Sequence, residues 1–587
     1  MSVHDFVSAP ARAFTLHMAS ALETAGTAAT GTVDVVAEAR ALVAGLTARP
    51  WGNASPSVYE TGRLVSLVPW LAGHDERLAY LLATQRPGGG WGPHNDYTLV
   101  PTLSATESLL AELARDARDP DGPAGDVRDP GALAQAAGRG LHALFRWSRR
   151  DYGSPFPDMP AIELIVPSLV TSINRHLHHL RDSRLDGLRT WAGAPPLPLP
   201  SGMDGARLEM IRSRLRSGDP LPEKLRHALE VAGDAVFQAP GVRPTAAGTV
   251  GASPAATAAW LGDLGRHDPG HPARLHLESA AEQHGGPVSC AVPITVFERG
   301  WVLSWLARAG IPVTVPDELV ESLGEGLGPG GVPAGPGLPA DADTTSVALY
   351  ALALLGAPRE PDSLLGYHTG THFCTWQGEQ GYSATVNAHV LDAFGQYVAA
   401  RPGARARYGE PMDRIAGWLR GRQNGDGSWS DRWHASPYYA TVCCALALDE
   451  FGGAASREAV RRAVRWVLST QRADGSWGLW RGTAEETAYA MQLLLLAGAP
   501  YDQAERQAAR GYAYLLGSTW PGNSGDPRTQ TWGYSDEHPP MWHDKDLYLP
   551  VAIVRAAILG ALHLAQRNPT SDPTSPPEHE TSHNRQT

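Results

Sequence analysis

Apolar residues recur at helical spacing along most of the chain, and they hardly ever alternate with polar residues over the length of a strand. Segments with apolar positions three and four residues apart include "IAGWLRGR", "AVRWVLST", "YYATVCCALAL" and "TAYAMQLLLLAG". Val, Ile and Thr are not gathered into alternating runs. The pattern therefore predicts an almost entirely α-helical protein.

A short motif recurs between these helical segments. It has the form Q-x-x-x-G-x-W and occurs as "QRPGGGWG" (85–92), "QNGDGSWS" (423–430) and "QRADGSWGLW" (471–480). The last two copies begin 48 residues apart, a spacing that suits one helical hairpin per repeat. Gly permits a tight turn, while Gln and Trp can hydrogen-bond and stack on adjacent helices. The motif is therefore predicted to have a structural role in the turns.

Length and charge restrict the class of protein. A chain of 587 residues is longer than a single small hydrophobic core usually holds, so two or three domains are expected. A chain of this length can also enclose a large buried cavity. The net charge of -12 and the lack of a Lys/Arg run exclude a nucleic-acid-binding surface, which needs clustered cations.

The cysteines and the two ends of the chain indicate the compartment. Cys290, Cys374, Cys443 and Cys444 show no C-x-x-C spacing and are typical of buried thiols in a reducing environment. The N-terminus lacks a basic segment followed by an apolar run, and no stretch is long and apolar enough to span a membrane. We expect a soluble cytoplasmic protein without stable membrane insertion. The polar, Pro-rich segment 568–587 is predicted to be disordered.

Two acids stand in front of one apolar segment. In "GLPADADTTSVALY" (337–350), Asp341 and Asp343 precede hydroxyl residues and a helical apolar run, where a carboxylate caps a helix. A plain helix cap explains the pair by itself. Paired acids beside hydroxyls can also keep one carboxylic acid protonated in a dry pocket, which is what proton transfer to a weakly basic alkene requires.

The acid pair together with the repeated turns resembles the class II terpene cyclases, whose D-x-D-D or D-x-D-T-T motif protonates an alkene to start cyclisation. Further segments resemble motifs of labdane-type diterpene cyclases and follow in the same order. They are "SVYETGRLVSLVP" (57–69), "AIELIVPSL" (161–169), "GASPAATAAWL" (251–261), "VFERGWVLSWLARAGI" (296–311) and "WHDKDLYLP" (542–550). The resemblance extends over most of the chain.

The resemblance implies an all-α protein of two α/α-barrel domains, the βγ architecture of terpene cyclases. The β domain would consist of residues 1–50 and 286–567, with a γ domain of residues 51–285 inserted into it. The active site is expected between the domains, with Asp341 and Asp343 on the β-domain face toward the γ domain.

Roles in the acid motif follow from the same resemblance. Asp343 is expected to be the general acid, and Asp341 and Thr344 to shape its hydrogen bonding. Asn387, in "SATVNAHVL", is expected to bond the other oxygen of Asp343. An asparagine on a helix face that bonds only to backbone is the alternative for Asn387.

The carbocation that follows protonation needs a wall with negative electrostatic potential and no nucleophile, and aromatic faces provide one. The candidates for this wall are Trp301, Trp376, Trp433, Tyr438, Tyr439 and Trp542. We expect about half of them to face the substrate and the others to pack in the core.

The final proton needs an acceptor. His227, in "LRHALE", matches the histidine that helps to hold a proton-accepting water in the related plant enzymes. Their partner asparagine is missing, and Ser289 or Cys290 stands at the corresponding place. An ordinary interior histidine is the alternative for His227.

The chain contains neither D-D-x-x-D nor N-D-x-x-S-x-x-x-E, so ionisation of the diphosphate is not expected. The resemblance implies Lys545 and Arg299 as anchors of the diphosphate, and Glu163 as a residue that helps to hold Mg²⁺ beside the phosphate oxygens. Ordinary ion pairs with neighbouring carboxylates are the alternative for Lys545 and Arg299.

The function implied is bicyclisation of geranylgeranyl diphosphate to a labdane-type or copalyl diphosphate, with a class I synthase or a phosphatase as the downstream partner. Farnesyl diphosphate cyclised to a drimane is an alternative, and so is a squalene-type triterpene cyclase, which normally shows D-x-D-D-T-A and a membrane-docking helix. A helical-repeat scaffold without catalytic activity explains the turns, but it gives no reason for Asp343 and Asn387 together.

Overall fold

The computed structural model describes residues 33–94, 97–118, 129–148, 157–180, 187–497, 502–518 and 538–567. The regular secondary structure within these residues is helical apart from one two-stranded hairpin, which confirms the predicted all-α class. The segment 568–587, predicted to be disordered, lies outside the described residues. None of the helices in the described part of the chain is long and apolar enough to cross a membrane.

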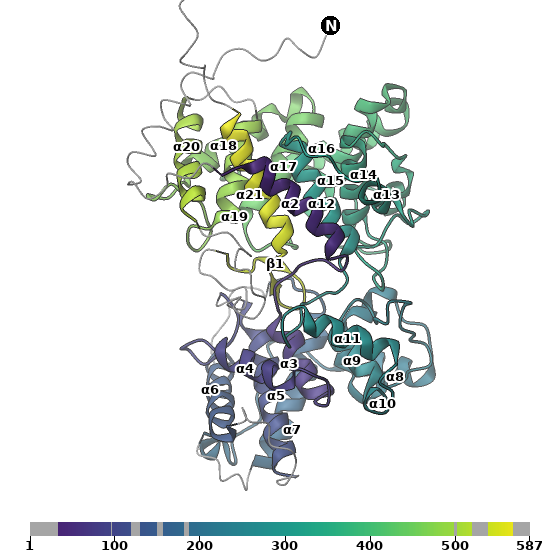
Figure 1. The fold of residues 1–587 in the computed structure, drawn as a ribbon, viewed down its shortest axis with the longest axis vertical. Coiled ribbons are helices and arrows are strands. Elements are labelled where there is room, and N and C mark those ends of the chain that lie inside the picture. The colour runs from purple at the N-terminus through teal and green to yellow at the C-terminus, as the bar shows by residue number, and fades with distance from the viewer. Residues whose placement is uncertain are drawn as a thin grey trace, which may run out of the picture.

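Two helical bodies are stacked one above the other (Figure 1). The lower body contains α3 (Val58–Leu67), α4 (His74–Ala83), α5 (Leu99–Asp116), α6 (Pro130–Ser148), α7 (Ile162–His179), η3 (Arg189–Trp191), α8 (Ala206–Ser217), η4 (Glu223–Val236), α9 (Pro254–Leu261), α10 (Leu264–His267) and α11 (Pro272–Glu282).

The upper body combines the first described helix with those that follow the lower body along the chain. Its helices are α2 (Val35–Ala48), α12 (Thr295–Arg308), α13 (Asp317–Gly324), α14 (Ala342–Leu354), η5 (Pro361–Tyr367), α15 (Ala384–Ala400), η6 (Pro402–Ala404), α16 (Arg405–Gly421), α17 (Pro437–Phe451), η7 (Ala454–Ser456), α18 (Arg457–Ser469), α19 (Ala484–Leu496), α20 (Asp502–Gly517) and α21 (Val551–Gln566).

Each body has its own hydrophobic core. One core takes its buried residues from 58–292, and the other takes them from 35–46 and 301–565. Helix α2 packs against α12 and α21, so the lower body is an insertion between α2 and α12. The predicted domain limits at 50/51 and 285/286 lie close to this divide, and the limits themselves stay a prediction.

Several helices begin at a residue that caps them through its side chain. The capping residues of α3, α9, α14, α15, α17 and α19 are Ser57, Ser253, Asp341, Ser383, Ser436 and Thr483. Each accepts a backbone N–H of the first turn, as expected for Ser, Thr and Asp at this position. First turns also carry Glu60, Asp343, Glu485 and Glu486, where the helix dipole favours a carboxylate.

The repeated turns have the structural role predicted for them. Each glutamine donates from Nε2 to the carbonyl of the glycine four residues on and to a carbonyl of another helix, at 2.8 to 2.9 Å. Each tryptophan donates from Nε1 to a carbonyl ten residues back, at 2.7 to 2.9 Å. The residues concerned are Gln85 with Trp91, Gln423 with Trp429, and Gln471 with Trp477.

A short hairpin connects the two bodies. Strand β1 (Trp542–His543) pairs antiparallel with β2 (Leu547–Tyr548), and it lies between the bodies in Figure 1. Trp542 belongs to the upper core, while Lys545 in the turn is bonded to residues of the lower body. This hairpin was not predicted, because strands of two residues leave no alternating pattern in the sequence.

Candidate active site

Helix α14 begins at the acid motif. Asp341 is its N-cap, and Asp341 Oδ1 accepts the backbone N–H of Thr344 at 2.6 Å. Burial raises the pKa of Asp341 to about 7, and the nearby charge of Asp343 adds to the effect. Asp341 is therefore the helix cap, and Thr344 bonds to Asp341.

Asp343, in the first turn of α14, is paired with a histidine. His389 Nδ1 on α15 lies 2.6 Å from Asp343 Oδ1. Burial lowers the pKa of His389, but the charge of Asp343 together with hydrogen bonds to Asp343 and Cys443 raises it well above its usual value. The Asp343 side chain is 16% exposed, so the carboxyl group is not sealed within the core. The pair can hold a proton close to an accessible surface.

Asn387, the predicted partner of Asp343, bonds elsewhere. Its Oδ1 accepts the N–H of Phe373 at 2.9 Å, and its Nδ2 donates to the carbonyls of Phe373 and Ser383 at 2.9 and 2.8 Å. The prediction of a bond to Asp343 is therefore wrong. Asn387 and His389 are two residues apart on α15, about 200° around the helix, so they face different neighbours.

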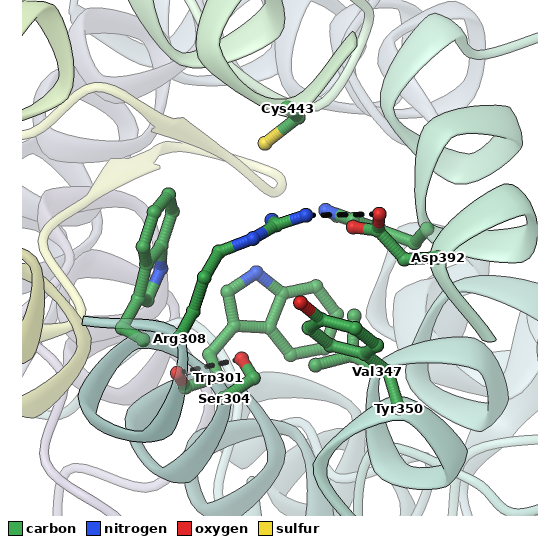
Figure 2. Close-up of a pocket in the computed structure, with 9 residues that line it drawn as sticks. Trp301, Ser304, Arg308, Val347, Tyr350, Asp392 and Cys443 are labelled. Atoms are coloured by element: carbon green, nitrogen blue, oxygen red, sulfur yellow. Dashed lines mark hydrogen bonds and ion pairs between the residues drawn. The ribbon is translucent and has the colours of Figure 1, made fainter. Parts of the chain in front are cut away.

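A cavity lies between α12, α14, α15 and α17 (Figure 2). His389 is among the residues that line it. The other lining residues are Trp301, Ser304, Trp305, Arg308, Val347, Tyr350, Asp392 and Cys443. Arg308 Nη2 donates to Asp392 Oδ1 at 2.9 Å, and Arg308 Nε donates to Glu450 Oε1 at 3.1 Å. Since the Glu450 side chain is 36% exposed, polar groups lead from the cavity toward solvent.

Three of the predicted aromatic residues form a continuous group beside the acid pair. Trp301 Nε1 donates to the Tyr439 hydroxyl at 2.8 Å, and the Trp301 ring meets His389 edge-on with centroids 5.5 Å apart. The Tyr439 ring lies 4.7 Å from that of Trp542. We call Trp301, Tyr439 and Trp542 the aromatic wall.

The remaining aromatic candidates divide into two sets. Trp376 and Trp433 are partly exposed and meet at right angles with centroids 5.4 Å apart. Lys224 of the lower body lies over the Trp376 ring at 5.4 Å. Tyr438 is buried against Trp466 at 4.6 Å, which is core packing. Which aromatic residues touch substrate stays a prediction.

His227 lies at the boundary between the two bodies. Its Nδ1 is 2.7 Å from the Gly251 carbonyl and its Nε2 is 2.9 Å from Asp544 Oδ1. Burial lowers the pKa of His227, but the charge of Asp544, its hydrogen bond and the charge of Glu60 together raise it. Because a carbonyl and a carboxylate only accept, both ring nitrogens donate and neither is free to take a proton.

The predicted partners of His227 bond to other groups. Ser289 Oγ donates to the Ala54 carbonyl at 2.7 Å, and Cys290 Sγ lies 3.7 Å from the Asp546 carbonyl. Asp544 is the partner in their place. Burial raises the pKa of Asp544, but the charge and hydrogen bond of His227, together with Lys545, lower it. Asp544 is only partly buried, so an ionised carboxylate stands at this boundary.

Lys545, the predicted diphosphate anchor, lies in a sealed ion-pair network. Its Nζ pairs with Glu60, lies 3.1 Å from Glu230 Oε1, and donates to Ser253 Oγ and to the His227 carbonyl at 2.8 Å each. An ammonium has only three hydrogens to donate, and these neighbours occupy them. The geometry supports a role in joining the two bodies.

Arg299 and Glu163 lie apart from this network. Arg299 is partly buried, which lowers its pKa, and Glu298 and Glu325 act against the effect. The Glu163 side chain is 46% exposed, with Arg207 Nη1 3.6 Å away. No group of three or more His, Cys, Asp or Glu in the described residues could hold a metal ion by itself. Glu163 therefore fits Mg²⁺ only where substrate oxygens supply most of the ligands.

Tyr548, in strand β2, is influenced by carboxylates from several parts of the proposed site. Burial raises the pKa of Tyr548 well above its usual value, and the charges of Asp544, Asp343 and Glu485 raise it further. The partly exposed Tyr548 is thus within the electric field of carboxylates from both ends of the site.

Sequence reasoning missed four residues of this site, namely His389, Asp544, Tyr548 and Glu485. His389 carried a signal, because it is an imidazole on the apolar segment that also holds Asn387. Asp544 and Tyr548 lie in the segment 542–550 with Lys545, but the family resemblance assigned the diphosphate to Lys545 and gave no role to these two residues. Glu485 carried no local signal, since an acid in a first turn is ordinary.

Comparison with known proteins agrees with this geometry. Residues 380–552 match the family model described as the squalene-hopene cyclase C-terminal domain. The chain is 41% identical over 532 residues to an ent-copalyl diphosphate synthase of Streptomyces sp. (strain KO-3988), covering 90% of this chain and 96% of the relative.

Two further proteins extend the comparison. A labda-7,13-dienyl diphosphate synthase of Streptomyces clavuligerus is 40% identical over 557 residues, covering 92% of this chain and 95% of the relative. The solved structure of the ent-copalyl diphosphate synthase from Streptomyces platensis superposes with a TM-score of 0.82 at 44% identity, covering 91% of this chain and all of that one. The predicted α/α-barrel fold is confirmed. The chain belongs to the copalyl diphosphate synthase-like class II diterpene cyclases.

Proposed function

We propose that this class II cyclase converts geranylgeranyl diphosphate to a bicyclic labdane-type or copalyl diphosphate and keeps the diphosphate on the product. The observation that carries the proposal is the pair of Asp343 and His389 at 2.6 Å, with a partly exposed carboxyl group at the start of α14. The relatives named above, which make copalyl and labdadienyl diphosphates, support the same substrate class.

In the first step, protonated Asp343 gives its proton to the terminal alkene. The O–H bond breaks, a C–H bond forms, and a tertiary cation remains on the adjacent carbon. The charged His389 stabilises the carboxylate left on Asp343 through a charge-assisted hydrogen bond. The aromatic wall of Trp301, Tyr439 and Trp542 offers negative potential without a nucleophile.

In the last step, the bicyclic cation loses a proton and its C–H electron pair becomes the new alkene. The proposed acceptor is Asp544, directly or through a water that it holds, because both nitrogens of His227 already donate. The charged His227 keeps Asp544 ionised and reduces its nucleophilicity. A weak base is sufficient here, since a carbocation is a very strong acid.

Each turnover leaves Asp343 without its proton, so solvent must return one. The ion pair of Arg308 and Asp392, which lines the cavity beside His389, supports this return (Figure 2). The diphosphate end is proposed to contact Lys224 and Arg299 in the boundary region. Mg²⁺, when bound to the diphosphate and Glu163, would screen its charge.

Separate incubations of the purified protein with geranylgeranyl diphosphate, farnesyl diphosphate and squalene test the substrate. We expect a bicyclic product from geranylgeranyl diphosphate that still carries diphosphate in mass spectrometry of the untreated reaction. Turnover of squalene alone, or pyrophosphate released in step with cyclisation, would contradict the proposal. A C15 bicycle formed in preference to the C20 product would assign the shorter substrate.

Asp343→Asn tests the acid. We expect the rate to fall at least about a thousandfold, because an amide cannot supply the proton, while substrate binding is kept. Asp362→Asn, which removes an exposed carboxylate paired with Arg407, is the matched control. A rate for Asp343→Asn within about tenfold of wild type would remove Asp343 as the acid.

A further inference from the structure

Glu485 is a buried acid for which the proposed reaction has no role so far. It lies in the first turn of α19, and its side chain is 1% exposed. Its Oε1 accepts from Trp542 Nε1 at 2.8 Å, from the Tyr489 hydroxyl at 2.9 Å and from His434 Nε2 at 3.2 Å. Three donors on one oxygen are the environment of an ionised carboxylate.

The one side chain near Glu485 that can carry a positive charge, among the described residues, is His434. His434 Nδ1 lies 3.0 Å from the backbone nitrogen and 3.3 Å from the carbonyl oxygen of Ser436. Among the described residues, no lysine or arginine pairs with Glu485, and its Oε2 is buried without a hydrogen-bond partner. A buried carboxylate oxygen without a hydrogen-bond partner is unfavourable in the resting protein, so its position calls for a reason other than stability.

Glu485 is linked directly to the aromatic wall. The indole N–H of Trp542 points at its carboxylate, so the negative charge polarises the ring and makes its face more negative. Trp542 packs on Tyr439 at 4.7 Å, and the Tyr439 ring lies 6.4 Å from the ring of His389, the partner of the acid. The field of Glu485 also reaches Tyr548, where the field of Asp343 is felt.

We propose that Glu485 is a positioning residue for the carbocation: its buried charge acts through Trp542 to make the aromatic wall bind a positive chain in preference to a neutral one. This inference rests on the proposed function and deepens it. The attraction exists only once positive charge has formed, so it lowers the barrier without tightening substrate binding.

The next residue offers a matched control. Glu486 is also fully buried in the first turn of α19, but it accepts from Ser436 Oγ at 2.5 Å, from the Leu479 N–H at 2.8 Å and from Thr483 Oγ1 at 2.8 Å. These bonds join helix starts and turns, and none of them reaches an aromatic ring. Glu485→Gln and Glu486→Gln therefore make the same change of side chain at adjacent buried positions.

The test compares two inhibitors of the full-length protein. One is an analogue of geranylgeranyl diphosphate with an ammonium nitrogen in place of the carbon that first becomes cationic, and the other is its neutral carbon parent. We expect Glu485→Gln to lose at least about tenfold of the preference for the ammonium, with kcat reduced and KM unchanged. Glu486→Gln should keep the preference within about twofold, and Glu485→Asp should restore part of it.

Two outcomes would overturn the inference. One is an unchanged ammonium preference in Glu485→Gln, and the other is an equal loss of affinity for both inhibitors. If Glu485→Gln does not fold, Trp542→Phe keeps the ring and removes the N–H link, and an unchanged preference in that variant also overturns it. Failure of the wild type to cyclise geranylgeranyl diphosphate would instead contradict the proposed function.

Discussion

At the scale of single residues, positions two apart on one helix have different tasks. Asp341 caps α14 and Asp343 pairs with His389, although both belong to one short motif. On α15, Asn387 ties its helix to the backbone of Phe373, while His389 faces the acid. In both cases the direction of the side chain around the helix separates a structural residue from a chemical one.

His389→Ala and Asn387→Ala should therefore fail in different ways. His389→Ala is expected to lower kcat about a hundredfold, which corresponds to about 2.7 kcal/mol, because the carboxylate left on Asp343 loses its charged partner. Asn387→Ala leaves the buried Phe373 N–H without an acceptor, which costs about 1 to 3 kcal/mol of folding free energy. Steady-state kinetics and urea unfolding of both variants measure these effects. Equal kinetic losses in the two would contradict the assignment.

At the scale of elements, the Q-x-x-x-G-x-W turn is one device used in both bodies. The glutamine side chain donates to one carbonyl in the turn and to one in a second helix. The tryptophan indole donates to a carbonyl of the helix before the turn. The glycine two residues before the tryptophan has positive φ in these turns, at +102° for Gly427 and +89° for Gly475. A built Cβ at Gly427 would lie 2.5 Å from the Arg462 carbonyl, so a larger residue does not fit.

Gln423→Ala is expected to lower stability by about 1 to 3 kcal/mol, because the carbonyls of Gly427 and Ala459 lose their donor. Activity per folded molecule should not change, since the turn lies outside the proposed site. Urea unfolding measures the effect, with the exposed neighbour Asn424→Ala as the control at under about 1 kcal/mol. A loss of kcat without a loss of stability would assign the turn a catalytic role.

Glu298 on α12 gives a pH dependence of stability. Burial raises its pKa to about 7 from 4.5, and the N–H of Asn53 donates to it at 2.7 Å. Because the folded pKa is the higher one, the protonated acid stabilises the fold. That stability is present below about pH 4.5 and is lost as pH rises to about 7.

Glu298→Gln does not titrate, so its stability relative to wild type should rise between pH 4.5 and 8.5. The gain is up to about 3 kcal/mol, from a shift of 7 − 4.5 = 2.5 at 1.36 kcal/mol for each pKa step. Thermal unfolding of both proteins across this range measures the difference. A difference that is constant with pH would show that Glu298 keeps an ordinary pKa.

At the scale of the whole molecule, part of the proposed site forms only where the two bodies meet. Lys545 in the hairpin turn pairs with Glu60 and Glu230 of the lower body, and the adjacent Asp544 holds His227. Removing one partner from a buried ion pair typically costs about 3 to 5 kcal/mol, so this network fixes how the bodies meet. The proposed proton acceptor therefore depends on the docking of one body on the other.

Asp544→Asn should change the products rather than stop the reaction. An amide cannot accept the final proton, so we expect a severalfold larger share of hydroxylated or rearranged bicycles, with total turnover within about tenfold of wild type. His227→Ala should shift the products in the same direction, because Asp544 loses its charged partner. Gas chromatography after dephosphorylation measures the product ratio.

Asp546→Asn, in the same turn, serves as the control. Asp546 accepts the N–H of Tyr59 at 3.2 Å and supports the start of α3, so its loss should affect stability and leave the product ratio unchanged. A product ratio unchanged in Asp544→Asn at normal turnover would remove Asp544 as the acceptor. The final proton would then leave by way of another group, such as Tyr548.

The sequence by itself determined the features that depend on near neighbours. The helical class follows from apolar spacing, and the start of α14 follows from Asp341 and Thr344, which are three residues apart. The repeated turns were predictable because each tryptophan bonds only ten residues back. The acid itself was predictable because its motif is contiguous and resembles that of a known family.

Only the tertiary structure decided which groups meet across the fold. His389 lies 46 residues from Asp343 and His227 lies 317 residues from Asp544, and no local pattern encodes either pairing. The bond predicted for Asn387 came from the family resemblance, and a match of sequence segments does not show which side of α15 faces the acid. A hydrophobic pattern indicates which face of a helix is buried. The hydrogen-bond partner of each buried polar group depends on how the helices and the two bodies pack, and this packing is a property of the whole molecule.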